Sequence, residues 1–118
     1  MNASELDAEA FEKLVIEELD LLPDEMVEDL ENVAFVTLDR PADGTLSLLG
    51  EYDGVDITRR GNYGFGELPD RIVLYREPLL SVSRDLAELR DQVHATLVHE
   101  IAHYFGIGDS ELHDLGWG

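Results

Sequence analysis

Cysteine is absent from this chain, and basic residues, methionine and long apolar runs are scarce. Without cysteine there is no disulfide framework and no thiolate-bound zinc, so any metal site must use histidine and carboxylate ligands. No segment approaches the roughly 20 consecutive apolar residues that span a bilayer. The first residues, MNASELDAEAFEK, lack the basic and apolar regions of a signal peptide. These absences predict a cytoplasmic protein without a membrane partner.

Acidic residues far outnumber basic ones: 27 Asp and Glu stand against eight Lys and Arg, which gives a net charge of −19. The acids are concentrated at the start, where residues 1–31 hold twelve of them and a single base, Lys13. Such a surface repels phosphate groups, so we expect neither nucleic acids nor anionic membranes as partners. Solubility is the simplest explanation of so much acid, and a preference for basic substrates or partners is the alternative.

Helices are predicted near both ends of the chain, where apolar residues recur at helical spacing. The first covers residues 4–22, with Ser4 as its N-cap, and Pro23 ends it and opens a second short turn. The long closing helix covers 81–106, with Ser83 as its N-cap. Its buried stripe is expected to consist of Leu86, Leu89, Val93, Leu97, Ile101 and Phe105.

Strands are predicted where β-branched and aromatic residues lie between turn-forming residues. They cover 33–39, 45–52 and 71–80, and Pro78 marks the end of the third strand or an edge position. The order of helices and strands predicts one α+β domain over residues 1–118, long enough for a single core. We expect a small, twisted, mostly antiparallel sheet and a short C-terminal helix.

The segment HATLVHEIAHYFGIGD (94–109) places two histidines four positions apart on the predicted closing helix. Residues at that spacing lie on one face, so the imidazoles of His99 and His103 can both reach one zinc ion, at the typical distance of about 2.0–2.1 Å. Glu100 lies about 100° further round the helix axis, beside the ion, where it can take a proton from a metal-bound water.

The residues after the second histidine extend the motif to H-E-x-x-H-x-x-G-x-x-D. Gly106 can adopt the left-handed conformation that ends a helix and reverses the chain. Asp109, three residues further on, can then offer an oxygen to the same ion. Two histidines and one aspartate leave a coordination position for water, as in hydrolytic zinc sites. We therefore predict zinc bound by His99, His103 and Asp109, with Glu100 as the catalytic base.

The other two histidines are weaker candidates for metal ligands. His94 is about 140° round the helix from His99 and belongs on the surface or at the edge of the core. His113 is near enough in sequence to compete with Asp109 or to add a fourth ligand, although a place in the cleft beside the metal is the simpler expectation. Candidates for stabilising the oxyanion, none of them compelling, are Tyr52, Tyr63 and Tyr75.

These motifs resemble those of the zincin metallopeptidases. The glycine turn is similar to that of the metzincin branch, but no methionine follows Met26, so that branch's methionine turn is absent. A closer resemblance is to small bacterial zincin-like zinc metallopeptidases. The segments that carry this resemblance lie within residues 33–118 and are LLGEYDGVDITRRG, LPDRIVLYREPLL, TLVHEIAHYFGIGD and LHDLGW. The resemblance implies a small sheet beside the metal-binding helix, Zn²⁺ as cofactor and an extended peptide substrate paired with a sheet edge.

We therefore predict a monomeric, zinc-dependent metallopeptidase that hydrolyses a peptide or protein substrate through a zinc-bound water activated by Glu100. Residues 71–76 are the predicted edge strand for the substrate. The alternative is a non-catalytic zinc-binding interaction domain. The short chain favours this alternative, because it has few residues that could line a deep specificity pocket. In a third, metal-free interpretation, 94–106 is only a core helix, and a chelator leaves the melting temperature unchanged.

Overall fold

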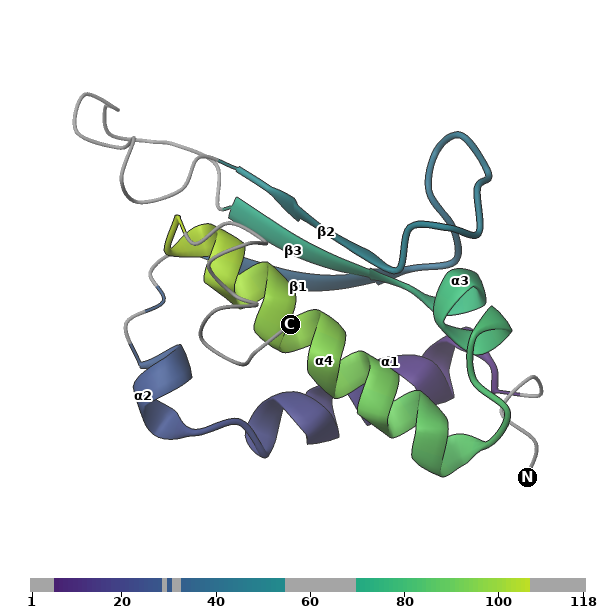
Figure 1. Ribbon diagram of the computed structural model, residues 1–118, viewed down its shortest axis with the longest axis horizontal. Coiled ribbons are helices and arrows are strands. Elements are labelled where there is room, and N and C mark those ends of the chain that lie inside the picture. The colour runs from purple at the N-terminus through teal and green to yellow at the C-terminus, as the bar shows by residue number, and fades with distance from the viewer. Residues whose placement is uncertain (1–5, 29, 31–32, 55–69, 107–118) are drawn as a thin grey trace.

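The computed structural model of the protein describes residues 6–28, 30, 33–54 and 70–106 (Figure 1). The α+β class predicted from the sequence is confirmed, and no helix in this described part combines the length and hydropathy that a membrane span requires. The elements follow in the order α1 (Ala8–Asp20), α2 (Asp24–Val27), β1 (Val33–Leu38), β2 (Gly50–Asp53), β3 (Asp70–Tyr75), α3 (Arg76–Ser81) and α4 (Leu86–Tyr104).

Both long helices begin at an aspartate that caps their first turn. Asp7 accepts a hydrogen bond from the backbone N–H of Ala10 at 2.8 Å and caps α1. The predicted cap, Ser4, lies outside the described residues. Asp85 caps α4, so the prediction of Ser83 is wrong. Aspartate suits both positions because its carboxylate accepts a hydrogen bond from a backbone N–H. The negative charge of the carboxylate is also stabilised by the positive end of the helix dipole.

The three strands form one mixed sheet in the order β1-β3-β2. β3 pairs in parallel with β1 and antiparallel with β2, so the sheet is not mostly antiparallel as predicted. The predicted edge strand, 71–76, is also wrong, because β3 occupies the middle of the sheet. Its unbroken apolar run Ile72–Tyr75 is buried, as is typical of a strand covered on both faces.

Two predicted strands are shorter than expected. The third ends where α3 begins, at Arg76. Pro78 lies in the first turn of that helix, where backbone N–H groups have no partner within the helix, so the missing N–H of proline costs no hydrogen bond. The second begins only at Gly50, because local bonds hold the preceding residues in turns. The Thr45 hydroxyl, for example, accepts a bond from the backbone N–H of Ser47 at 3.2 Å.

The two long helices pack against the sheet and against each other (Figure 1). Helix α4 contacts β2 and β3, and α1 contacts β1 and α4. Arg90 on α4 joins the two helices by donating to Glu17 and Glu18, each at 2.8 Å, and the hydrogen bond from Arg90 lowers the pKa of the Glu17 carboxyl. The core between the layers includes Phe11, Leu14, Ile72, Leu74, Leu89, Val93, Leu97 and Ile101. Four of the six residues predicted for the buried stripe of α4 are in this core, and the other two pack against it.

Candidate metal centre

Strand β2 lies along α4 in a regular register. Gly50 lies against Thr96 and Glu100, and the ring of Tyr52 meets that of Tyr104 edge-on, with centroids 6.2 Å apart. Two residues advance a strand by about 7 Å and four residues advance a helix by about 6 Å, so alternate residues of β2 meet successive turns of α4. The backbone at the start of β2 is thereby held beside Glu100.

Gly50 makes this close approach possible. A Cβ atom at this position would lie 2.5 Å from Cγ2 of Thr96, 3.0 Å from the carbonyl oxygen of Val73 and 3.6 Å from Cγ of Glu100. The first distance is well inside van der Waals contact, at which carbon atoms are about 3.5–4.0 Å apart. Glycine is therefore required here for space between strand and helix.

Replacing Gly50 by alanine should lower the free energy of unfolding by about 1–3 kcal/mol, the usual cost of overpacking. Urea denaturation of the variant and the parent measures the difference. The matched control is Glu51→Ala, the exposed neighbour in the same strand, which should change stability by no more than about 0.5 kcal/mol. Adding Thr96→Ser to Gly50→Ala removes the Cγ2 atom and should restore part of the loss. A Gly50→Ala protein as stable as the control would contradict the packing.

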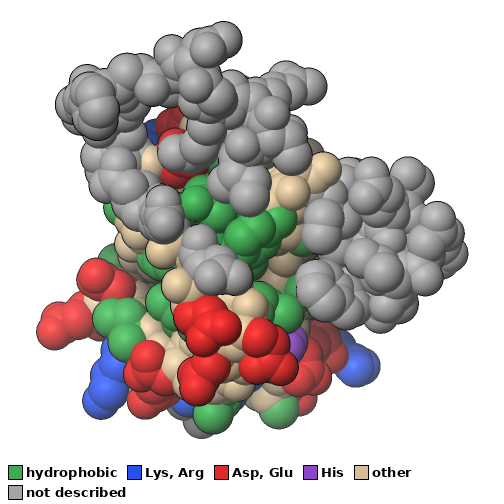
Figure 2. Space-filling model, turned by 90° about the vertical axis from the view of Figure 1, so that its left-hand side faces the viewer, with side chains coloured by type: hydrophobic (Ala, Val, Ile, Leu, Met, Phe, Trp, Pro, Cys, Tyr) green, Lys and Arg blue, Asp and Glu red, His purple; other side chains and the backbone are tan. Residues whose placement is uncertain are grey.

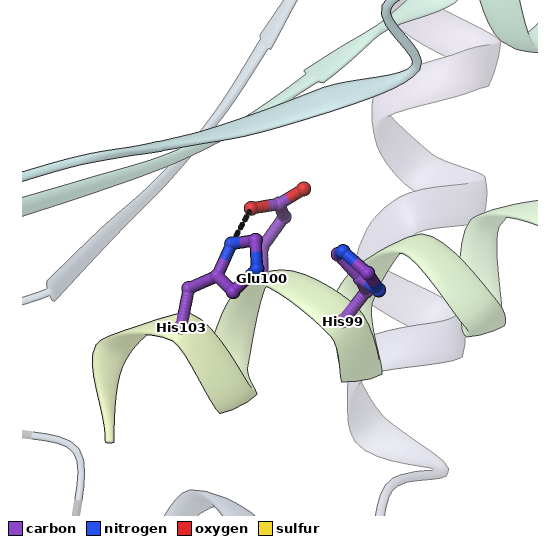
Figure 3. Close-up of side chains that lie close together, drawn as sticks. All are labelled: His99, Glu100 and His103. Carbon is purple, nitrogen blue, oxygen red and sulfur yellow. Dashed lines mark hydrogen bonds and ion pairs between the residues drawn. The ribbon is translucent and has the colours of Figure 1, made fainter. Parts of the chain in front are cut away.

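Three side chains of α4 converge beside β2, namely His99, Glu100 and His103 (Figure 3). Each offers a ligand atom, and these atoms all lie within 4.8 Å of one another. The imidazole centroids are 4.6 Å apart, and Nδ1 of His103 lies 3.0 Å from Oε1 of Glu100. Glu100 is buried, with 6% of its surface exposed, whereas both histidines are half-buried. The convergence that the sequence predicts for the two histidines is present.

The contact between His103 and Glu100 is the part of the centre that sequence reasoning missed. Their i,i+3 spacing could have indicated it, because side chains at that spacing are neighbours on a helix. A hydrogen bond to one ring nitrogen fixes the orientation of an imidazole, as partners of metal-binding histidines commonly do. The Glu100 carboxylate therefore lies beside the His103 imidazole and also fixes its orientation.

The donor set fits a divalent transition metal. The two imidazoles suit zinc, whereas oxygen-preferring ions such as Mg²⁺ are bound through carboxylates and water instead. No second group of three His, Asp or Glu side chains with this spacing occurs within the described ranges. The described residues can thus hold a metal at the position that the motif predicts.

The turn after α4 agrees with the prediction. Gly106 has a φ of +79° and its N–H donates to the carbonyl oxygen of His103 at 3.0 Å, so it ends the helix in the left-handed conformation. Asp109 and His113 lie outside the described residues, so their roles remain predictions. His94 is exposed, as predicted, and lines a groove between α4 and the connection from α1 to α2.

Two of the three tyrosines considered for the oxyanion are within the described part. The Tyr52 hydroxyl donates to Oδ2 of Asp70 at 2.5 Å. Tyr75 is buried in β3, and burial raises the pKa of its hydroxyl. Tyr63 lies outside the described residues. Neither Tyr52 nor Tyr75 is therefore assigned to the reaction, and Tyr63 stays a candidate predicted from the sequence.

A comparison with models of known protein families identifies the family of this chain. The family model of zincin-like metallopeptidases matches residues 25–117, which include all three strands and the whole of α4 with its two histidines and Glu100. A comparison with curated proteins finds no match. The sheet that packs beside α4 and the cluster of His99, Glu100 and His103 are both consistent with membership of this family. This chain belongs to the zincin-like metallopeptidases.

Proposed function

We propose that this protein is a zinc-dependent peptidase whose reaction takes place at the candidate metal centre. The observation that carries the proposal is the convergence of two imidazoles and a buried carboxylate on one turn of α4, in a chain of this family. Zinc bound there supplies a Lewis acid that polarises the scissile carbonyl and lowers the pKa of a water. A zincin-like peptidase acts on peptide bonds, so the substrate is a peptide or a protein.

Each residue of the centre has a distinct role in this proposal. His99 and His103 hold the metal, with Asp109 as the third ligand predicted from the sequence. Glu100 accepts a proton from the attacking water as the water oxygen bonds to the scissile carbon. When the carbon–nitrogen bond breaks, the Glu100 carboxyl gives that proton to the leaving amine, which restores the carboxylate. The 3.0 Å contact between Oε1 of Glu100 and Nδ1 of His103 places this base beside one of the two histidines.

We propose β2 as the strand that binds the substrate backbone. Among the described strands it lies at an edge of the sheet and beside Glu100, whereas β3 is central. The backbone N–H of Tyr75 donates to the carbonyl of Leu49 at 3.0 Å, and alternate residues of an antiparallel pair face the partner strand. The polar backbone groups of Gly50 therefore point away from β3. An extended peptide can pair with them by strand addition.

Digestion of a mixed peptide library tests the proposal. The purified protein with one equivalent of Zn²⁺ should produce new peptide termini, detected by mass spectrometry, and 1,10-phenanthroline should stop the cleavage until zinc is restored. Zinc binding without cleavage across the library would overturn the proposal and support a zinc-binding interaction domain. A melting temperature that neither zinc nor chelator changes would support the metal-free interpretation.

A further inference from the structure

A cleft of about 300 Å³ opens directly beside the metal centre, and His99 and Glu100 form part of its lining. The remainder comes from two segments that are far apart in the sequence. Leu48, Leu49 and Gly50 belong to the start of β2 and the residues before it, and Gln92, Ala95 and Thr96 belong to α4. The cleft is thus a product of the close approach of β2 to α4, and it reaches the residue proposed to move the proton.

We propose that this cleft is a substrate subsite that receives an uncharged, apolar side chain of medium size from a residue flanking the scissile bond. This rests on the proposed peptidase function, because the lining of the cleft includes Glu100 itself. A substrate residue whose backbone pairs with Gly50 lies beside this opening. The cleft, rather than the metal centre, then determines which peptides are cleaved.

The lining of the cleft is chemically suited to an apolar group. Leu48 and Leu49 contribute apolar side chains, and Ala95 contributes only a methyl group. The hydroxyl of Thr96 donates to the carbonyl oxygen of Gln92 at 2.7 Å, so this hydroxyl is engaged by its own helix. A volume of about 300 Å³ is at the lower end of the range for ligand sites, which suits a single side chain.

Charge around the cleft disfavours an acidic substrate residue. Glu100 is the one charged side chain among the described lining residues, and its carboxylate would repel a second carboxylate. Apart from the cleft, the whole chain carries a net charge of −19, and acidic side chains gather on the lower part of the face shown in Figure 2. A basic side chain is also unfavourable here, because an ion pair with Glu100 would occupy the carboxylate that the reaction needs.

A peptide library randomised on both sides of the scissile bond measures this selectivity. The zinc-loaded parent should favour Leu, Met or Val over Asp at one flanking position by roughly tenfold or more. Ala95→Phe fills the cleft and should shift that preference to Gly and Ala, whereas Gln92→Arg adds a cation and should admit Asp and Glu. The control is Ala87→Phe, an exposed site on α4 that does not line the cleft, which should keep the parental profile.

The result separates this proposal from the peptidase function. Cleavage with no side-chain preference, or with a preference for Lys and Arg that Ala95→Phe leaves unchanged, would overturn the subsite and leave the peptidase intact. If no peptide is cleaved, binding to the zinc-loaded parent decides instead, because this protein keeps the Glu100 carboxylate that should exclude an acidic group. N-acetyl-leucinamide should then shift the methyl NMR signals of Leu48 and Ala95, and N-acetyl-aspartamide should not. Equal shifts with both, or none with the leucine probe, would overturn the subsite.

Discussion

Glu100→Gln should strongly reduce peptide cleavage by the zinc-loaded protein while zinc stays bound. Glutamine has nearly the same shape as glutamate and can still contact His103, but its amide cannot accept a proton at neutral pH. General acid–base catalysis contributes about 10²–10⁴-fold to a reaction rate, so kcat/KM should fall by about that factor. Cleavage of one library-derived peptide by parent and variant, at equal zinc occupancy, measures the loss.

The matched control for this variant is Glu88→Gln, the same substitution on the same helix. Glu88 contacts Arg84 at 3.1 Å near the start of α4, away from the metal centre, so its loss should leave kcat/KM unchanged. Full activity in Glu100→Gln would show that another group takes the proton. Loss of zinc together with activity would show that Glu100 is a metal ligand rather than the base.

The helical part of the centre could be predicted because its geometry is local. Spacing alone places His99 and His103 on one face of any α-helix, and a glycine three residues later is a common left-handed end. The structure bears out both features. The cap of α4 was less predictable, because Ser83 and Asp85 are both good caps, and the Ser83 hydroxyl instead donates to the carbonyl oxygen of Leu79 at 2.8 Å.

The rest of the site depends on contacts between distant segments, which the spacing of residues does not reveal. Nothing near Gly50 in the sequence indicates that it lies against Glu100, since the contact follows from the position of β2 beside β3 and α4. The order of the strands is likewise a matter of long-range pairing. The apolar run in β3 was a usable signal for a central strand, and Pro78 obscured it by suggesting an edge.

Removal of either imidazole should cost most of the affinity for zinc. His99 and His103 supply both imidazoles of the cluster within the described residues, so loss of either one leaves a single imidazole beside the Glu100 carboxylate. We expect His99→Ala and His103→Ala each to weaken zinc binding by more than the roughly 10–100-fold typical of losing an outer partner of a ligand. Competition against a chelating indicator dye measures the dissociation constants.

His94→Ala is the control for these variants, because His94 is exposed on the same helix and outside the cluster. It should bind zinc as tightly as the parent. Thermal unfolding gives an independent readout: free zinc at 100 times its dissociation constant should stabilise parent and control by about 2.7 kcal/mol, and the two ligand variants far less. Asp109→Ala tests the third ligand in the same assay. If it binds zinc as the parent does, while His113→Ala does not, the third ligand is His113. An equal loss of affinity in His94→Ala and His99→Ala would contradict the metal centre itself.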